Sequence, residues 1–410
     1  MGVPEGPSEG PAAANVHPLR NRTFLIVWLG QSVSLIGSGI STIAVIWWVF
    51  LVTGSTILLA AVALASTIPR VVVGPFAGAY VDRWDRRKTM AVIDAVAGGA
   101  TVVVALTLAA NALEIWHLYA FGVIVGFGTI FHSTALLASV PNIVHPEQLS
   151  RGNSLMQLSH SVSGVVGPAV GGVLVVIVDV APALLIDAGT FFFASATLLL
   201  LAFPSPRSTT KKTIAADIVE GFGFLRRRPA LLTLLGLFAF INFFFIPLFI
   251  LLPVVATAIL GLGVAGFGFL QSSLFAGLLV GGLLFAAVKL RRHFGLYIAV
   301  AIVGLGLFYV LFGWSSVLVF SILSLAGIGF SVALASVSSS TIFQREVPLE
   351  LQGRVFSARA VLAQGLQPIA LATVGILAAS LGVQTLLIWS GTFIAVLGVL
   401  SLASSGIRKL

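Results

Sequence analysis

Long apolar stretches, each followed by a short polar or charged break, fill the chain from residue 24 onward. A helix that crosses a bilayer needs about 20 consecutive, mostly apolar residues. Twelve stretches meet this requirement: 24–52, 57–81, 89–110, 117–139, 153–178, 183–203, 231–257, 264–288, 296–313, 317–340, 355–380 and 384–403. The pattern therefore predicts an all-α membrane protein with twelve transmembrane helices.

The longest polar break, residues 204–230, separates six predicted helices from the next six. Loops 139–154 and 341–356 occupy equivalent places in the two halves and align Pro146 with Pro348. A duplicated six-helix unit is typical of secondary transporters, whose substrate path lies between the repeats. We expect two pseudo-symmetric six-helix bundles, divided as follows: disordered tail 1–23, N-terminal bundle 24–203, linker 204–230, C-terminal bundle 231–403 and C-terminal tail 404–410.

The distribution of charge gives an orientation. Only 9% of the residues are charged, and 58% are hydrophobic, whereas soluble domains are about 25% charged. Of the 22 lysines and arginines, twenty fall on one side of the predicted helices, and Arg70 and Arg359 fall inside them. Because such residues collect in cytoplasmic loops, we expect a multi-pass protein of the cell (plasma or inner) membrane with both termini in the cytoplasm. Basic residues spread over separate loops in this way do not indicate a nucleic-acid partner.

Patterns for catalysis and for cofactor binding are missing from the sequence. It has no Walker A loop and no cysteine, and its six histidines are scattered. We therefore expect no enzyme activity, no cofactor and no metal site. Any driving force is then an ion gradient or the gradient of the substrate itself.

The segment GAYVDRWDRR, residues 78–87, carries a motif between the second and third predicted helices. It resembles a motif of the major facilitator superfamily, with residues Gly78, Asp82, Arg83, Arg86 and Arg87 in the matching places. The resemblance implies that Asp82 meets the start of helix eleven, at 352–357, when the cytoplasmic side is closed. Asp82 would then act as a latch between the halves.

Helix five contains a second motif, GVVGPAVGG at 164–172. It is similar to the antiporter motif of drug exporters in the same superfamily, matched by Gly167, Pro168, Gly171 and Gly172. The alternative is simple packing, because small residues let membrane helices approach closely. Further stretches, including GPFAGAYVDRWDRRKTM and IFQREVPLELQGRVFS, look like the macrolide-efflux and multidrug branch.

The chain departs from that branch at two positions. Gly122 stands on helix four where many proton-coupled relatives carry an arginine, and Ser38 follows Gly37 on helix one where many carry an acid. These departures put the usual coupling residues in doubt.

Ionisable residues inside predicted helices are candidates for function because burying a charge in a bilayer is costly. Arg70 lies near mid-membrane and is either a cavity residue or a structural arginine bound to carbonyls of a neighbouring helix. Asp187 is an outer-gate carboxylate, a coupling site or a favourable anion near a helix start. His132 and His160 lie at similar depth and are either proton carriers or packed neutral side chains. Asp94 is expected to anchor the basic loop.

Uncharged polar residues near aromatic side chains are candidates for substrate contact. They are Gln31, Asn242 and Gln364, together with Gln271 and Gln367. Apolar pockets with a few polar groups suit bulky, amphipathic ligands.

Together these features predict a secondary active transporter that works by alternating access. We expect a monomer in the lipid bilayer that exports hydrophobic or amphipathic small molecules, such as macrolide-like drugs, in exchange for protons. A lipid, lysophospholipid or siderophore transporter, or a facilitator, stays open as an alternative, as does a non-transporting receptor.

Overall fold

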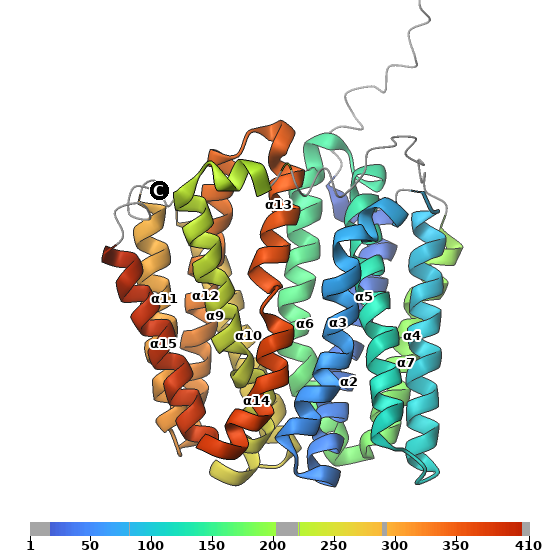
Figure 1. Cartoon of the computed structure of the whole chain (residues 1–410). Helices are drawn as coiled ribbons and strands as arrows, with labels where there is room; N and C mark the ends of the chain where they lie inside the picture. Colours follow the sequence, from blue (N-terminus) through green and yellow to red (C-terminus); the bar gives the residue numbers. More distant parts are fainter. Residues whose placement is uncertain (1–16, 82, 202–219, 221, 289–292, 404–410) are drawn as a thin grey trace, which may run out of the picture.

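The computed structural model describes residues 17–81, 83–201, 220, 222–288 and 293–403 (Figure 1). Every long element in that part of the chain is a helix. The first half contains α2 (Arg22–Thr53), α3 (Thr56–Val81), α4 (Arg86–Ala109), α5 (Ile115–Ile143), α6 (Leu149–Val178) and α7 (Val180–Leu200). The second half contains α9 (Pro229–Val254), α10 (Val264–Ala287), α11 (Phe294–Trp314), α12 (Leu318–Glu346), α13 (Leu349–Gln364), α14 (Gln367–Leu381) and α15 (Val383–Ala403).

The prediction of twelve membrane-spanning helices is confirmed. Within the described residues, twelve helical spans are long and apolar enough to cross a bilayer. An even number of crossings places the start of α2 and the end of α15 on the same side, which we call the terminal side, and the other we call the far side. Much of the predicted linker, 204–230, lies outside the described residues.

Helix boundaries differ from the prediction mainly at prolines. The fourth span continues past Pro141 to Ile143, and the amide of Val144 still bonds the carbonyl of Val140. The eleventh span is broken between Gln364 and Gln367 into α13 and α14. Pro368 lacks the N–H that would bond the carbonyl of Gln364, four positions earlier, which accounts for the break.

Equivalent helices pack in equivalent ways in the two halves, which stand side by side in Figure 1. In the first half α4 packs on α7, α3 on α5, α4 on α5, and α2 on both α6 and α7. In the second half α11 packs on α15, α10 on α12, α11 on α12, and α9 on α13, α14 and α15. Each helix pair of the first half corresponds to the pair found six spans later in the second half. The two halves therefore repeat each other in helix packing as well as in their loops.

Two helix pairs, α6 with α10 and α3 with α14, make most of the contacts between the halves. Their specific contacts lie toward the far side. Ser272 of α10 donates a hydrogen bond to the carbonyl of Val165 at 2.7 Å, and Thr56 of α3 donates to the carbonyl of Gly375 at 3.2 Å. The halves are thus fastened together in the part of the membrane opposite the termini.

Candidate functional site

The cavity at the centre of the candidate site lies between α2, α3, α5 and α7, and α9 of the second half closes it. It has a volume of about 400 Å³, which lies in the range of drug-sized ligand pockets. Most of its wall is apolar, and its polar lining includes Arg70, Asp187 and the hydroxyls of Ser38, Ser41 and Thr42.

Asp187 of α7 is the carboxylate of this cavity. Its residue is 1% exposed. Ser41 of α2 donates a hydrogen bond to its Oδ2, and Thr190 donates to its Oδ1 at 3.2 Å. Gly37 permits this arrangement, since a Cβ there would collide with Asp187 and Thr190. Ser41 and Thr190 escaped the sequence analysis, although Gly37 and Ser41 are four residues apart and therefore share one face of α2.

Arg70 of α3 presents its guanidinium to the same cavity. Its Nε donates to the carbonyl of Ser66 at 3.1 Å, and its Nη2 donates to the hydroxyl of Thr67 at 3.1 Å. Both partners belong to α3, whereas the structural alternative expected carbonyls of a neighbouring helix. The arginine is therefore anchored to its own helix beside the cavity.

The two departures noted in the sequence occur at this cavity. Gly122 lines it together with Arg70, and Ser38 lines it together with Asp187. A Cβ at Gly122 would lie 3.3 Å from the Cβ of Ala65, so α5 and α3 approach closely there and a side chain would press against α3. The cavity thus contains a cation, Arg70, and a carboxylate, Asp187. These residues lie on the second and sixth helices, and not on the fourth and first, where many relatives carry theirs.

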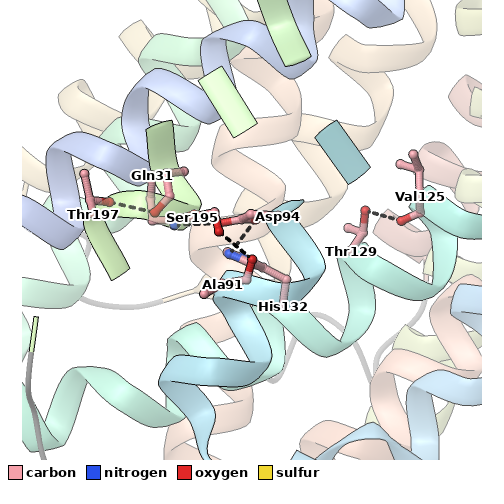
Figure 2. Close-up of polar contacts among 9 residues, drawn as sticks. Gln31, Ala91, Asp94, Val125, Thr129, His132, Ser195 and Thr197 are labelled. Atoms are coloured by element: carbon pink, nitrogen blue, oxygen red, sulfur yellow. Dashed lines mark hydrogen bonds and ion pairs between the residues drawn. The ribbon is translucent and has the colours of Figure 1, made fainter. Parts of the chain in front are cut away.

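A second polar cluster lies in the first half, outside the cavity lining (Figure 2). Asp94 of α4 is 3% exposed. Its Oδ2 accepts a hydrogen bond from Nε2 of Gln31 at 3.3 Å, and its Oδ1 lies 3.2 Å from Nε2 of His132. Asp94 was expected to anchor the basic loop, but these partners come from the membrane-spanning parts of α2 and α5.

His160 of α6 is the other predicted histidine. It is exposed, and its imidazole lies near that of His132. Ser159, its neighbour, shares a hydrogen bond of 2.7 Å with Ser32 of α2. Polar groups of α2, α4, α5 and α6 therefore gather on the terminal side of the cavity.

The loop motif ties helices of the first half together. Asp85 caps α4 by accepting a hydrogen bond from the amide of Lys88 at 3.1 Å. Arg86 donates to the carbonyl of Ala138 at 2.7 Å, and Arg87 donates to the carbonyl of Leu201. The amide of Arg83 bonds the carbonyl of Tyr80 in the turn after Gly78. Asp82 lies outside the described residues, so its predicted role as a latch stays a prediction.

The glycines of the helix-five motif lie at two close helix contacts. Gly167 and Gly171 face α2, where an added Cβ would come within 2.9 Å of Gly39 and 2.8 Å of Ile40. Gly172 faces α10, where a Cβ would lie 2.8 Å from the carbonyl oxygen of Val264. The carbonyl of Pro168 lies against Gly268 of α10. The motif therefore sits between helix one of its own half and helix eight of the other half.

None of the five uncharged polar residues predicted for substrate contact, Gln31, Asn242, Gln271, Gln364 and Gln367, lines the cavity. The side chain of Asn242 bonds the carbonyl of Phe238 in its own helix at 2.8 Å. Gln364 is exposed at the break between α13 and α14. The second half contributes Phe249 and Ile250 of α9 to the cavity instead.

Twelve membrane-spanning helices in two repeated bundles, with a partly polar cavity formed mostly by the first bundle and bounded by α9 of the second, define a multi-pass membrane transporter. The model of the Major Facilitator Superfamily matches residues 27–371. The chain belongs to this superfamily, whose members are transporters and not enzymes.

Individual relatives agree with this assignment. The chain is 29% identical to macrolide efflux protein A of Streptococcus pyogenes, in an alignment that covers 94% of this chain and 97% of that protein. It is 26% identical to the multidrug efflux pump Tap of Mycolicibacterium fortuitum, in an alignment that covers 91% of this chain and 93% of Tap. Among solved structures, the nucleoside transporter NupG superposes with a TM-score of 0.74, at 13% identity, over 93% of this chain and 99% of NupG. The last comparison shows the fold alone.

Proposed function

We propose that this protein exports hydrophobic or amphipathic small molecules from the cytoplasm and is driven by an inward flow of protons. The cavity is the observation that carries the proposal. Its apolar wall suits a bulky apolar ligand, and its few polar groups are placed to orient one. Efflux proteins of similar sequence support the direction of transport.

The charges of the cavity favour substrates of low net charge. Asp187 and Arg70 line the same space, so a carboxylate and a guanidinium offset each other. Arg70 would repel a strongly cationic ligand, and Asp187 would repel a strongly anionic one. Weakly charged compounds with several oxygen atoms, such as macrolides, can accept hydrogen bonds from Arg70 and from the cavity hydroxyls.

The proposed orientation places the terminal side in the cytoplasm of the cell and in the cell membrane. The excess of lysine and arginine in the loops of that side supports it. The contacts between the halves at the far side, such as Thr56 with Gly375, then close the outward path. Because the cavity is formed within one chain, we also propose that a monomer is sufficient for transport.

The test uses inside-out membrane vesicles and radiolabelled erythromycin. We expect uptake into the vesicles when their lumen is acidic, and its loss when a protonophore is added. Vesicles with equal amounts of a variant that replaces Asp187 by Asn serve as the matched control, because the carboxylate is lost with little change in shape. Uptake no greater than in vesicles without the protein would refute export of this substrate. Uptake that survives the protonophore would refute proton coupling.

A further inference from the structure

Asp94, His132 and Gln31 form a buried cluster of polar groups that the cavity does not use. His132 lies three residues beyond Thr129, a cavity residue on the same helix, so it sits about 4.5 Å further along the axis of α5 toward the terminal side. Figure 2 shows the imidazole turned toward Asp94, and Gln31 reaching the carboxylate from the other side.

The surroundings of Asp94 contain few other charges. On α7 the groups near it are hydroxyls, and Ser195 donates to the carbonyl of Ala91 at 2.8 Å. Asp187, further along α7, is bound to Ser41 and Thr190. On α6 the nearby titratable group is His160. The basic residues at the start of α4 bind carbonyls of Ala138 and Leu201.

Charge balance makes such a pair a proton site. An isolated carboxylate inside a membrane is costly, and a protonated histidine beside it cancels its charge. Histidine is the side chain whose charge ordinarily changes between about pH 5 and 8. When Asp94 is ionised and the imidazole of His132 carries the extra proton, the net charge of the pair is zero. The pair therefore favours binding one proton.

The geometry also provides for the released state. After the proton leaves Nδ1 of His132 for water, Nε2–H of the neutral ring stays 3.2 Å from Oδ1 of Asp94, and Gln31 still donates to Oδ2. The carboxylate then keeps its hydrogen bond from Gln31 and a polar neighbour in the imidazole. The His132 side chain is 15% exposed and that of Asp94 is 5% exposed, so the imidazole is the partner within reach of water.

We propose that Asp94 and His132 bind the proton that is exchanged for substrate, with Gln31 as a positioning residue, at a site separate from the substrate cavity. This inference rests on the proposed proton-coupled export. It assigns substrate contact to the cavity, and proton binding to the cluster one helical turn nearer the terminal side. Opening that side to water would let the proton leave while the substrate enters.

The test compares two activities of the purified protein in liposomes, with radiolabelled erythromycin as the probe. Exchange of labelled for unlabelled erythromycin requires no net proton movement, whereas accumulation against a gradient requires an imposed pH difference. For Asp94→Asn and His132→Gln we expect exchange to persist and pH-driven accumulation to fall at least about tenfold, the size of losing one charged hydrogen bond. Ser139→Ala removes a buried hydroxyl of α5 that bonds only its own helix at 2.7 Å, and we expect both activities to be unchanged.

Gln31→Leu separates a positioning role from a merely structural one. It removes one donor from the Asp94 carboxylate, so proton release should need a higher pH. We expect the pH profile of accumulation to move upward while exchange stays as in the unmodified protein. An unmoved profile would overturn the role given to Gln31.

The remaining outcomes distinguish the two proposals. Accumulation at the original level in Asp94→Asn or His132→Gln would overturn the proton site and leave proton-coupled export standing. Loss of exchange together with accumulation, at normal protein levels, would show that the pair serves folding or substrate binding, and would also overturn the site. Absence of exchange in the unmodified protein would instead refute erythromycin as a substrate.

Discussion

The two halves share one packing plan but differ in chemistry. Helix pairs such as α4–α7 and α11–α15 correspond after a shift of six spans. Yet the first half holds the ionisable residues Arg70, Asp94 and Asp187 within its spans, whereas in the second half Arg359 lies inside a span and Arg345 and Glu346 lie at the end of α12. The same architecture thus carries a polar interior on one side and a nearly apolar one on the other.

The two halves therefore contribute differently to the cavity. The first half supplies most of the cavity and all of its charges, and the second half closes it with Phe249 and Ile250. Arg359 lies with its guanidinium carbon 4.7 Å from the ring centre of Phe343 and 5.8 Å from that of Phe356. Arg359 is therefore held by aromatic rings of its own half.

Replacing Asp187 by Asn is expected to have the largest effect. The substitution keeps the shape but removes the charge that accepts bonds from Ser41 and Thr190. Hydrogen bonds to charged groups are worth about 1.5–3 kcal/mol, so we expect the initial rate of erythromycin efflux to fall about 10- to 100-fold. The control is Asp179→Asn, because Asp179 caps the far end of the same helix at the amide of Val180. Equal rates for the two variants would contradict the special role of Asp187.

Exchanging arginine for methionine in each half tests the comparison directly. Methionine is long and unbranched and fills similar space. Arg70→Met removes the cavity cation, and we expect about a tenfold loss of transport from a charged contact of about 1.5 kcal/mol. Arg359→Met removes cation–π contacts worth about 0.5–2 kcal/mol, so thermal stability in detergent should fall while transport changes little. A larger transport loss for Arg359→Met than for Arg70→Met would break the comparison.

The joint between the halves gives a smaller, conformational effect. Gly268→Ala on α10 places a methyl against the carbonyl of Pro168 on α6, and overpacking costs about 1–3 kcal/mol. We expect the far side to open more often. Since the chain has no cysteine, a Thr42→Cys background reports this as faster labelling of the cavity from the far side.

The matched control for that experiment is Gly282→Ala on the same helix, where an added Cβ meets no atom within 4 Å. It should label at the original rate. Equal labelling of both alanine variants would show that the α6–α10 contact does not set which side is open.

The sequence was sufficient for the helices and for the identity of the polar residues, but not for their partners. Bilayer thickness limits each span, so twelve spans could be counted from apolar runs alone. The rotation of each helix is less visible, because lipid and the helix-packing interior are similarly apolar. That is why Asp94 was expected to anchor the basic loop, while its partners are Gln31 and His132. The sharing of one cavity by Arg70 and Asp187 depends on the same unseen rotations.

The smallest effect is expected at Asn242, and it sharpens the comparison between equivalent helices. In α2, Gln31 reaches a carboxylate on another helix, whereas in α9, which has the equivalent place in the second half, Asn242 bonds the carbonyl of Phe238 in its own helix. A neutral hydrogen bond of this kind contributes about 0.5–1.5 kcal/mol, and that carbonyl keeps its place in the helix when the side chain is replaced. We therefore expect Asn242→Leu to leave both erythromycin exchange and pH-driven accumulation within about twofold of the original. If Asn242→Leu lost as much pH-driven accumulation as Asp94→Asn, polar groups of the second half would also take part in transport. The two halves would then differ in residue type but not in function.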